Sequence, residues 1–113
     1  MAEEEQEAVG IRIAKVRQRL EEVDQRLTFL KKAVKSMANV NLKHRYLMNR
    51  LETTWQDDSE LGPYFKKMDE HMLHSLSDKR VAYEQERDAL KAEQHDLEQK
   101  LQRLFAERAF MKY

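Results

Sequence analysis

The sequence predicts an all-α protein: an antiparallel two-helix hairpin of coiled-coil type that completes a bundle with partner helices. Three observations carry this prediction. Ala, Glu, Lys, Leu and Arg supply 58 of the 113 residues, a composition typical of coiled coils and long helices. Apolar residues recur every three or four positions, which is the helical period. Only one segment, near residue 60, interrupts that pattern, so we expect a single domain over residues 1–113.

Composition also excludes several classes of protein. The 21 basic and 21 acidic residues cancel, so the uniform basic field of a nucleic-acid-binding protein is missing. There is no cysteine, which rules out disulfides, thiolate metal sites and a thiol nucleophile. No apolar run has the roughly 20 residues of a membrane span, and the acidic start is unlike a signal peptide.

The first helix is predicted over about residues 5–56, with Gly10 marking a frayed end. Its seam alternates steps of three and four residues through nine consecutive apolar positions, which is a sustained coiled-coil repeat. The members are Val9, Ile13, Val16, Leu20, Val23, Leu27, Leu30, Val34 and Met37. The next two seam positions are Asn41 and His44. They form either a buried polar layer that fixes register, or the edge of a stripe shifted onto neighbouring apolar residues.

One flank of this helix changes character along its length. Arg12, Arg19 and Arg26 occupy successive heptad positions, and Ala33, Val40 and Leu47 continue the same line. A narrow seam edged by arginine suits one partner helix, whereas a wider apolar face suits two. The second half of the helix is therefore predicted to face more than one helix.

The turn is predicted at residues 57–62 and the second helix at about residues 63–111. Gly62 can adopt a positive φ, Pro63 suits the first turn of a helix, and the Asp and Ser residues before them supply capping oxygens. A turn centred near residue 60 makes the numbers of facing residues add to about 120. On that register His44 faces Leu76, and Asn41 lies close to Arg80.

Two helices cannot enclose a face with three apolar positions per heptad, and uncovered apolar surface usually marks an interface. We therefore expect the functional unit to contain further helices, from a helical protein partner or, when the chain is alone, from a second copy. The predicted partner-binding residues are Leu27, Leu30, Ala33, Val34, Met37, Val40, Leu47, Met48, Leu51, Trp55, Phe65, Phe105 and Phe110.

Aromatic residues gather at the bend and at the C-terminus. Trp55 and the Pro63-Tyr64-Phe65 group either plug the end of the hairpin, which we favour, or form a docking knob for a partner. Phe105 and Phe110 present the same choice, and there we favour docking.

No catalytic, cofactor or metal site is predicted, and we do not expect an enzyme. His71, His74 and Asp78 share a helix face, but nothing completes a metal coordination sphere around them. The clusters Lys31-Lys32-Lys35 and Lys43-His44-Arg45 lack interleaved aromatic residues, so we interpret them as a solvated flank rather than a nucleic-acid or membrane site.

The predicted layout combines a hairpin of about 110 residues, Trp55 before the turn, aromatic residues after it, and the Glu- and Arg-rich segment 82–90. This layout resembles the LXG-associated alpha-helical (Lap) proteins and the WXG-type small helical partners of Gram-positive type VII secretion. The resemblance implies a targeting chaperone that packs against the N-terminal helical domain of an LXG toxin, either alone or together with a second small helical protein. From composition we expect neither nucleic-acid binding nor membrane insertion. It also implies a cytoplasmic location, with co-export beside the partner as an alternative.

The sequence departs from that family in two places. Gln56 and Asp57 follow Trp55, so the WXG tripeptide is absent. The only match to the family's aromatic-x-x-x-acid export motif is Phe65 with Asp69, at the start of the second helix instead of beyond its end. A homo-oligomeric coiled-coil spacer and a type III or flagellar export-stalk hairpin are the alternative functions.

Overall fold

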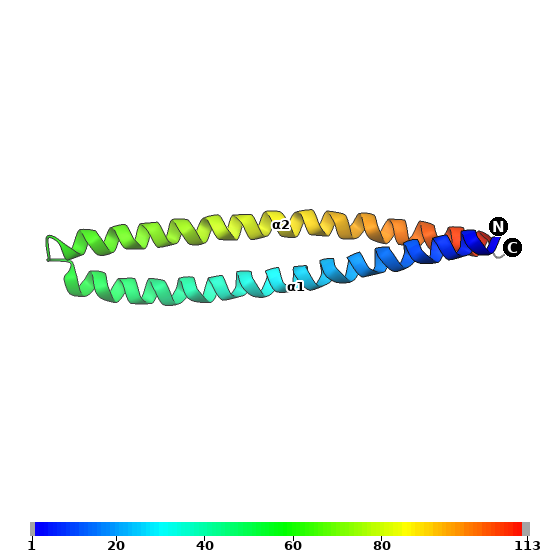
Figure 1. The fold of residues 1–113 in the computed structure, drawn as a ribbon. Coiled ribbons are helices and arrows are strands. Elements are labelled where there is room, and N and C mark those ends of the chain that lie inside the picture. Colours follow the sequence, from blue (N-terminus) through cyan, green and yellow to red (C-terminus); the bar gives the residue numbers. More distant parts are fainter. Residues whose placement is uncertain (1, 112–113) are drawn as a thin grey trace. The chain divides into compact units, whose positions relative to one another are not determined.

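The computed structural model of the protein describes residues 2–111, and these form two long helices (Figure 1). Helix α1 spans Ala2–Trp55 and helix α2 spans Leu61–Met111, with residues 56–60 between them. This confirms the all-α antiparallel hairpin. Both helices begin earlier than predicted, and Gly10 lies inside α1 rather than at a frayed end. Three glutamates in the first turn of α1 favour this early start, because they face the positive end of the helix dipole.

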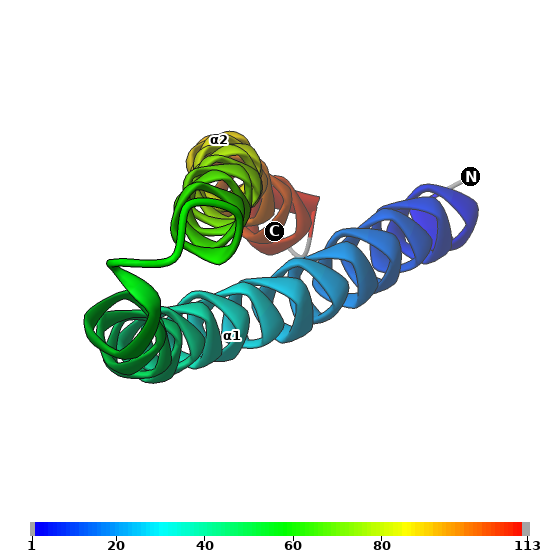
Figure 2. The same cartoon turned by 90° about the vertical axis from the view of Figure 1, so that its left-hand side faces the viewer.

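Asp58 organises the turn between the helices. Its Oδ1 accepts backbone hydrogen bonds from Glu60 at 2.9 Å and from Leu61 at 2.8 Å, which caps the start of α2. These two bonds, that from Leu61 first, hold the pKa of the Asp58 carboxyl below its ordinary value. The backbone N–H groups that begin α2 are thereby satisfied, and the chain crosses directly from one helix to the other (Figure 2).

Gly62 does not use the positive φ that is open to glycine, since none of the described residues has one. Gly62 is helical, and a Cβ atom there would lie 3.3 Å from the carbonyl oxygen of Trp55. Glycine fits this position well, because the start of α2 passes close to the end of α1 and a Cβ atom would press on the Trp55 carbonyl. Pro63 follows in the first turn of α2, where a missing N–H is tolerated.

The described residues form two compact units of similar size. Unit 1 contains the part of α1 up to Phe29 and the part of α2 from Glu86 onward. Unit 2 contains Leu30–Gln85, including the turn. Each unit pairs a segment of α1 with an antiparallel segment of α2.

Unit 1 has a closed apolar seam. Val9, Ile13, Val16 and Leu104 form a buried cluster with exposed fractions of 2–5%, and Val23 is fully buried. Partly buried apolar side chains surround the cluster, namely Leu20, Leu97, Leu101, Phe105 and Met111. The seam predicted for the first half of helix 1 is thus confirmed.

Two ion pairs close one edge of this seam. Arg19 binds Glu93 through two hydrogen bonds of 2.6 and 2.9 Å, and Arg26 binds Glu86 through two of 2.7 and 2.9 Å. The hydrogen bonds that each arginine donates lower the pKa of its glutamate, and those that Arg19 donates to Glu93 are the main cause of the raised pKa of Arg19. At Arg19 and Arg26 the predicted arginine edge therefore consists of bidentate bonds to α2.

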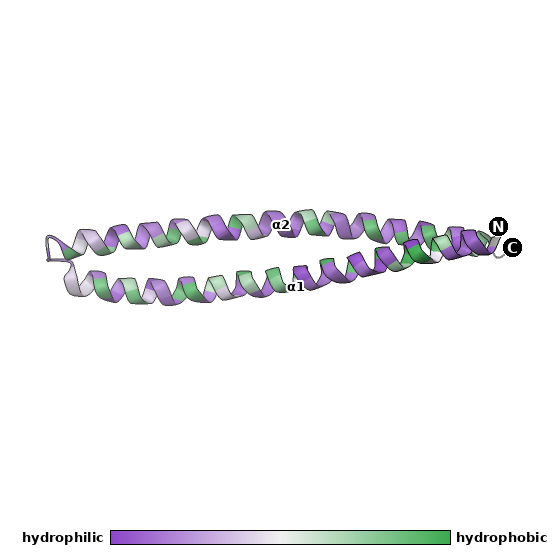
Figure 3. Cartoon of the chain, viewed as in Figure 1, coloured by the Kyte–Doolittle hydropathy of each residue, from purple (hydrophilic) through white to green (hydrophobic). Residues whose placement is uncertain are grey.

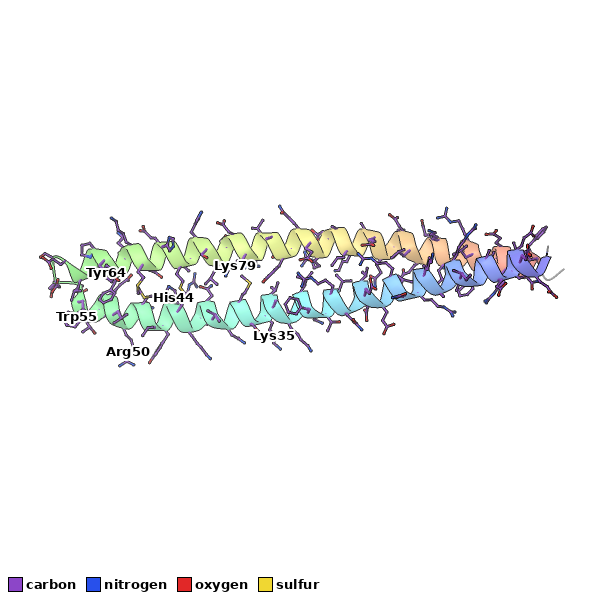
Figure 4. All side chains as sticks on the ribbon, in the orientation of Figure 1. Lys35, His44, Arg50, Trp55, Tyr64 and Lys79 are labelled. Atoms are coloured by element: carbon purple, nitrogen blue, oxygen red, sulfur yellow. The ribbon has the colours of Figure 1, made fainter. Side chains whose placement is uncertain are left out.

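The seam of unit 2 is sparser and more polar. Leu30 and Met48 are its only buried apolar side chains among the described residues. His44 is also buried and points toward α2 (Figure 4), where its Nε2–H donates to Asp69 Oδ1 at 2.9 Å. His44 was predicted to face Leu76, but its hydrogen-bonding partner lies seven residues earlier in the chain. A polar layer does cross unit 2, and His44 with Asp69 forms it.

Neither helix has a long hydrophobic stretch. Coloured by hydropathy, both helices change repeatedly between hydrophilic and hydrophobic residues along their length (Figure 3). Within residues 2–111, no helix is both long and apolar enough to span a membrane.

Candidate protein-interaction site

The structure separates the predicted partner-binding residues into accessible and buried groups. Leu30 and Met48 have exposed fractions of 1% and 2%, which places them inside the seam and out of a partner's reach. Val40, Leu47, Trp55 and Phe110 are exposed. The remaining predicted residues are half-buried, namely Leu27, Ala33, Val34, Met37, Leu51, Phe65 and Phe105.

Val40 and Leu47 lie on one side of the seam of unit 2. Val40 is four residues before His44 and Leu47 three after it, so the helical period displaces both to the same side of His44. Phe65 and Met72 bear the same relation to Asp69 in α2. Because the helices are antiparallel, this shared rotation brings all four residues to one side of the pair.

We call Val40, Leu47, Phe65 and Met72 the open flank. Val40 is 44% exposed, Leu47 54% and Met72 39%, while Phe65 is half-buried. Met68, 41% exposed, lies beside Met72 and Phe65 on the outer side of the flank. No ion pair covers these side chains in the described part of unit 2, so apolar surface from both helices is accessible together.

Sequence reasoning found the α1 half of the open flank and missed Met68 and Met72. The signal was present in the sequence. Going backward from Glu93 in steps of seven residues gives Glu86, Lys79, Met72 and Phe65. The α2 line thus changes from acidic to apolar in parallel with the change from arginine to Val40 and Leu47 in α1. The sequence prediction for helix 2 considered other heptad positions, so it did not include this change.

The part of α1 between Asp24 and Glu52 is strongly basic. Residues 25–51 contain seven Lys or Arg and no Asp or Glu. The net charge of zero therefore conceals a cationic segment, which the interpretation as an ordinary solvated flank overlooked. Its members are Arg26, Lys31, Lys32, Lys35, Lys43, Arg45 and Arg50.

A cleft of about 450 Å³ lies on the other side of the unit 2 seam. It is lined mainly by apolar side chains of both helices, including Val34, Met37 and Leu73, together with Asn41 and Arg80. Asn41 Oδ1 is buried and has no hydrogen-bond partner. The predicted proximity of Asn41 and Arg80 is confirmed, but Arg80 Nε donates to Glu84 at 3.0 Å.

The aromatic residues at the bend remain accessible. The Tyr64 and Phe65 rings meet edge to face with centroids 5.7 Å apart. Trp55 is 41% exposed and Tyr64 59%, and Figure 4 shows both beside the turn. The favoured expectation that this group plugs the end of the hairpin is therefore wrong for Trp55 and Tyr64, because neither side chain is enclosed.

The two C-terminal aromatic residues have different environments. Phe105 packs against the buried cluster of unit 1, and the guanidinium groups of Arg17 and Arg108 lie 5.1 and 5.2 Å from its ring centroid. Phe110 is 84% exposed. Phe105 is thus part of the seam edge of unit 1, whereas Phe110 is accessible.

Of the groups considered for metal binding or export, His71 is exposed and the others make local contacts. His74 Nε2 lies 3.5 Å from Asp78 Oδ2, and both side chains are largely exposed. Over residues 2–111, no three acidic or histidine side chains are arranged to hold a metal ion. In the candidate export motif, Phe65 is half-buried and Asp69 accepts the hydrogen bond from His44.

Comparisons with known proteins place the chain in a family. No curated protein and no solved structure matches it. The family described as protein of unknown function (DUF3958) matches residues 2–111, which is nearly the whole hairpin. The chain therefore belongs to the DUF3958 family.

Proposed function

We propose that this protein is a non-enzymatic helical adaptor that binds another helical protein through unit 2. The observation that carries the proposal is the open flank, where accessible apolar side chains of both helices lie side by side. Exposed apolar surface that spans two elements is typical of protein interfaces. A long two-helix hairpin also buries little surface by itself, so covering this flank would stabilise it.

The client proposed is the N-terminal helical domain of a type VII-secreted LXG toxin, and the role is support of its export. The resemblance to Lap proteins supports this choice of client. The size of the hairpin, the position of Trp55 before a five-residue turn, and the exposed aromatic residues at that turn are consistent with it.

Co-expression with the N-terminal domain of an LXG toxin from the same genome tests the proposal. We expect the two chains to copurify, and Val40→Asp or Leu47→Asp to abolish copurification, since each places a charge in an apolar contact. Ile11→Asp is the matched control. Ile11 has the same 54% exposed fraction as Leu47 but lies in unit 1, so this variant should retain the partner.

The proposal fails if Val40→Asp and Leu47→Asp both copurify with the toxin domain as wild type does. Circular dichroism of the free variants checks that their helices persist. A free chain that forms a discrete, stable homotetramer and ignores the toxin domain would favour the homo-oligomeric spacer instead.

A further inference from the structure

We propose that the open flank binds an acidic amphipathic helix of a different protein, whose carboxylates meet a rim of lysine and arginine around the apolar side chains. This inference rests on the proposed adaptor function and specifies the chemistry of its partner. The rim consists of Lys32, Lys43 and Arg50 from α1 and Lys79 from α2.

The rim follows from the same helical geometry as the open flank. Lys43 adjoins His44 on the side that carries Val40 and Leu47, and Arg50 is seven residues further along. Lys79 is one heptad beyond Met72 in α2. All of these basic side chains are exposed, and they extend beyond the apolar residues toward solvent.

No acidic residue of the unit 2 helices lies on this side. Asp69 is in the seam, where it binds His44. By helical position, Glu52, Glu70 and Glu84 lie on the other side of the seam, and Asp78 lies on the outer face of α2. The α1 edge of the open flank therefore carries Lys32, Lys43 and Arg50, and the α2 edge carries Lys79 one heptad beyond Met72. A partner helix placed there meets cations on both of its edges.

The charge of the rim decides between occupants. A second copy of this chain, bound through a two-fold axis, would place one basic rim against another, and like charges in contact are unfavourable. DNA or an anionic membrane would match the charge alone. Neither accounts for accessible Val40, Leu47 and Met72 from two helices, a shape that fits the apolar stripe of a third helix.

Two synthetic peptides measure the preference directly. Each is an amphipathic helix of about four heptads with Leu at positions a and d, flanked by Glu in one peptide and by Lys in the other. Fluorescence anisotropy with the full chain at low salt should show at least roughly tenfold tighter binding of the Glu peptide. Raising the salt concentration should reduce that ratio.

Charge reversal on the rim tests the location. Lys43→Glu combined with Lys79→Glu should reduce the preference for the Glu peptide roughly tenfold. The control is Lys35→Glu with Lys67→Glu, which makes the same charge change at one residue of each helix. Lys35 is two and a half helical turns from His44 and points away from α2 (Figure 4), and Lys67 lies on the outer face of α2. This control should keep most of the preference.

Several outcomes would overturn the inference. They are absence of binding to the Glu peptide, equal binding of both peptides, or equal losses in the rim and control variants. Tighter binding of a duplex DNA or of phosphatidylserine-containing vesicles than of the Glu peptide would assign the flank to those ligands. If Leu47→Asp still abolishes toxin copurification while the peptides show no charge preference, the adaptor function stands and only the acidic partner is rejected.

Discussion

The two units apply opposite chemistry at equivalent heptad positions. In unit 1 the flank is closed by Arg19 with Glu93 and Arg26 with Glu86, beside a buried apolar cluster. In unit 2 the positions that continue these lines carry Val40 and Leu47 in α1 and Met72 and Phe65 in α2. Carboxylate–guanidinium pairs satisfy one another within the chain, whereas exposed apolar side chains are stabilised only when another surface covers them.

The seam of unit 1 is also more apolar than the seam of unit 2. Among the residues that the structure describes, five apolar side chains are buried in unit 1 and two in unit 2. A histidine–aspartate pair and an unpaired asparagine oxygen lie in the seam of unit 2 in place of further apolar contacts. Two segments of similar length thus differ in how completely they satisfy their own residues. Unit 1 buries more of its apolar side chains, and unit 2 leaves more of them accessible.

The largest expected effect is a difference in the free energy of unfolding between two leucine-to-alanine variants, one in each unit. Leu104→Ala in unit 1 should lower the free energy of unfolding by about 2–3 kcal/mol, because Leu104 is 5% exposed within the apolar cluster. Leu47→Ala in unit 2 should change it by less than about 0.5 kcal/mol, because that side chain is 54% exposed. Urea unfolding followed by circular dichroism measures both. Equal losses would remove the distinction between the units.

A smaller effect of opposite sign is expected at Asn41. The Asn41→Leu variant lacks the buried oxygen that has no hydrogen-bond partner, and its side chain fills part of the cleft. The free energy of unfolding should therefore rise by about 1 kcal/mol. Asn39→Leu, at an exposed position of the same helix, is the control and should have little effect. A decrease in stability for Asn41→Leu would show that the Asn41 side chain is satisfied in the free protein.

The smallest effect is the pH dependence of the unit 1 ion pairs. Their arginines hold the pKa values of Glu86 and Glu93 below the ordinary 4.5, so these carboxylates favour the folded state at neutral pH. This contribution is present above about pH 4.5 and is lost as the pH falls through the lowered values.

Thermal melts of wild type and of Glu86→Gln with Glu93→Gln test that contribution. The two proteins should differ slightly in midpoint at neutral pH and converge in acid. Glu98→Gln with Glu107→Gln, at exposed positions of the same helix, is the control for the loss of two carboxylates. A difference that persists in acid would assign the effect to something other than ionisation.

The seam of helix 1 was predictable because its apolar residues follow the heptad without interruption from Val9 to Met37. The register in which the two helices pair was not predicted correctly. The predicted turn centred near residue 60, whereas the structure centres it at Asp58, with Gly62 against the carbonyl of Trp55. The cross-helix pairs all show the same displacement. The residue numbers of Arg19 and Glu93, of Arg26 and Glu86, and of His44 and Asp69 add to 112 or 113 instead of about 120, which brings Asp69 rather than Leu76 to His44.

Only the α1 part of the candidate site could be predicted from the sequence, so the predicted site lacked most of its α2 part. Val40 and Leu47 stand out because they replace arginines on a fixed heptad line. Met72 becomes recognisable only once the Arg19–Glu93 and Arg26–Glu86 pairs identify the facing line in α2. The burial of Leu30 and Met48 likewise depends on how α2 packs against α1. The helical periodicity of α1 does not specify which of its residues α2 covers.

Amide hydrogen exchange on the free chain, followed by mass spectrometry, tests the central claim most directly. Peptides from the unit 1 seam, around residues 9–23 and 97–104, should exchange slowly because their packing is complete. Peptides around residues 37–51 and 65–76 should exchange faster and become protected when a helical partner covers the open flank. Uniform protection of both units in the free chain would contradict the account.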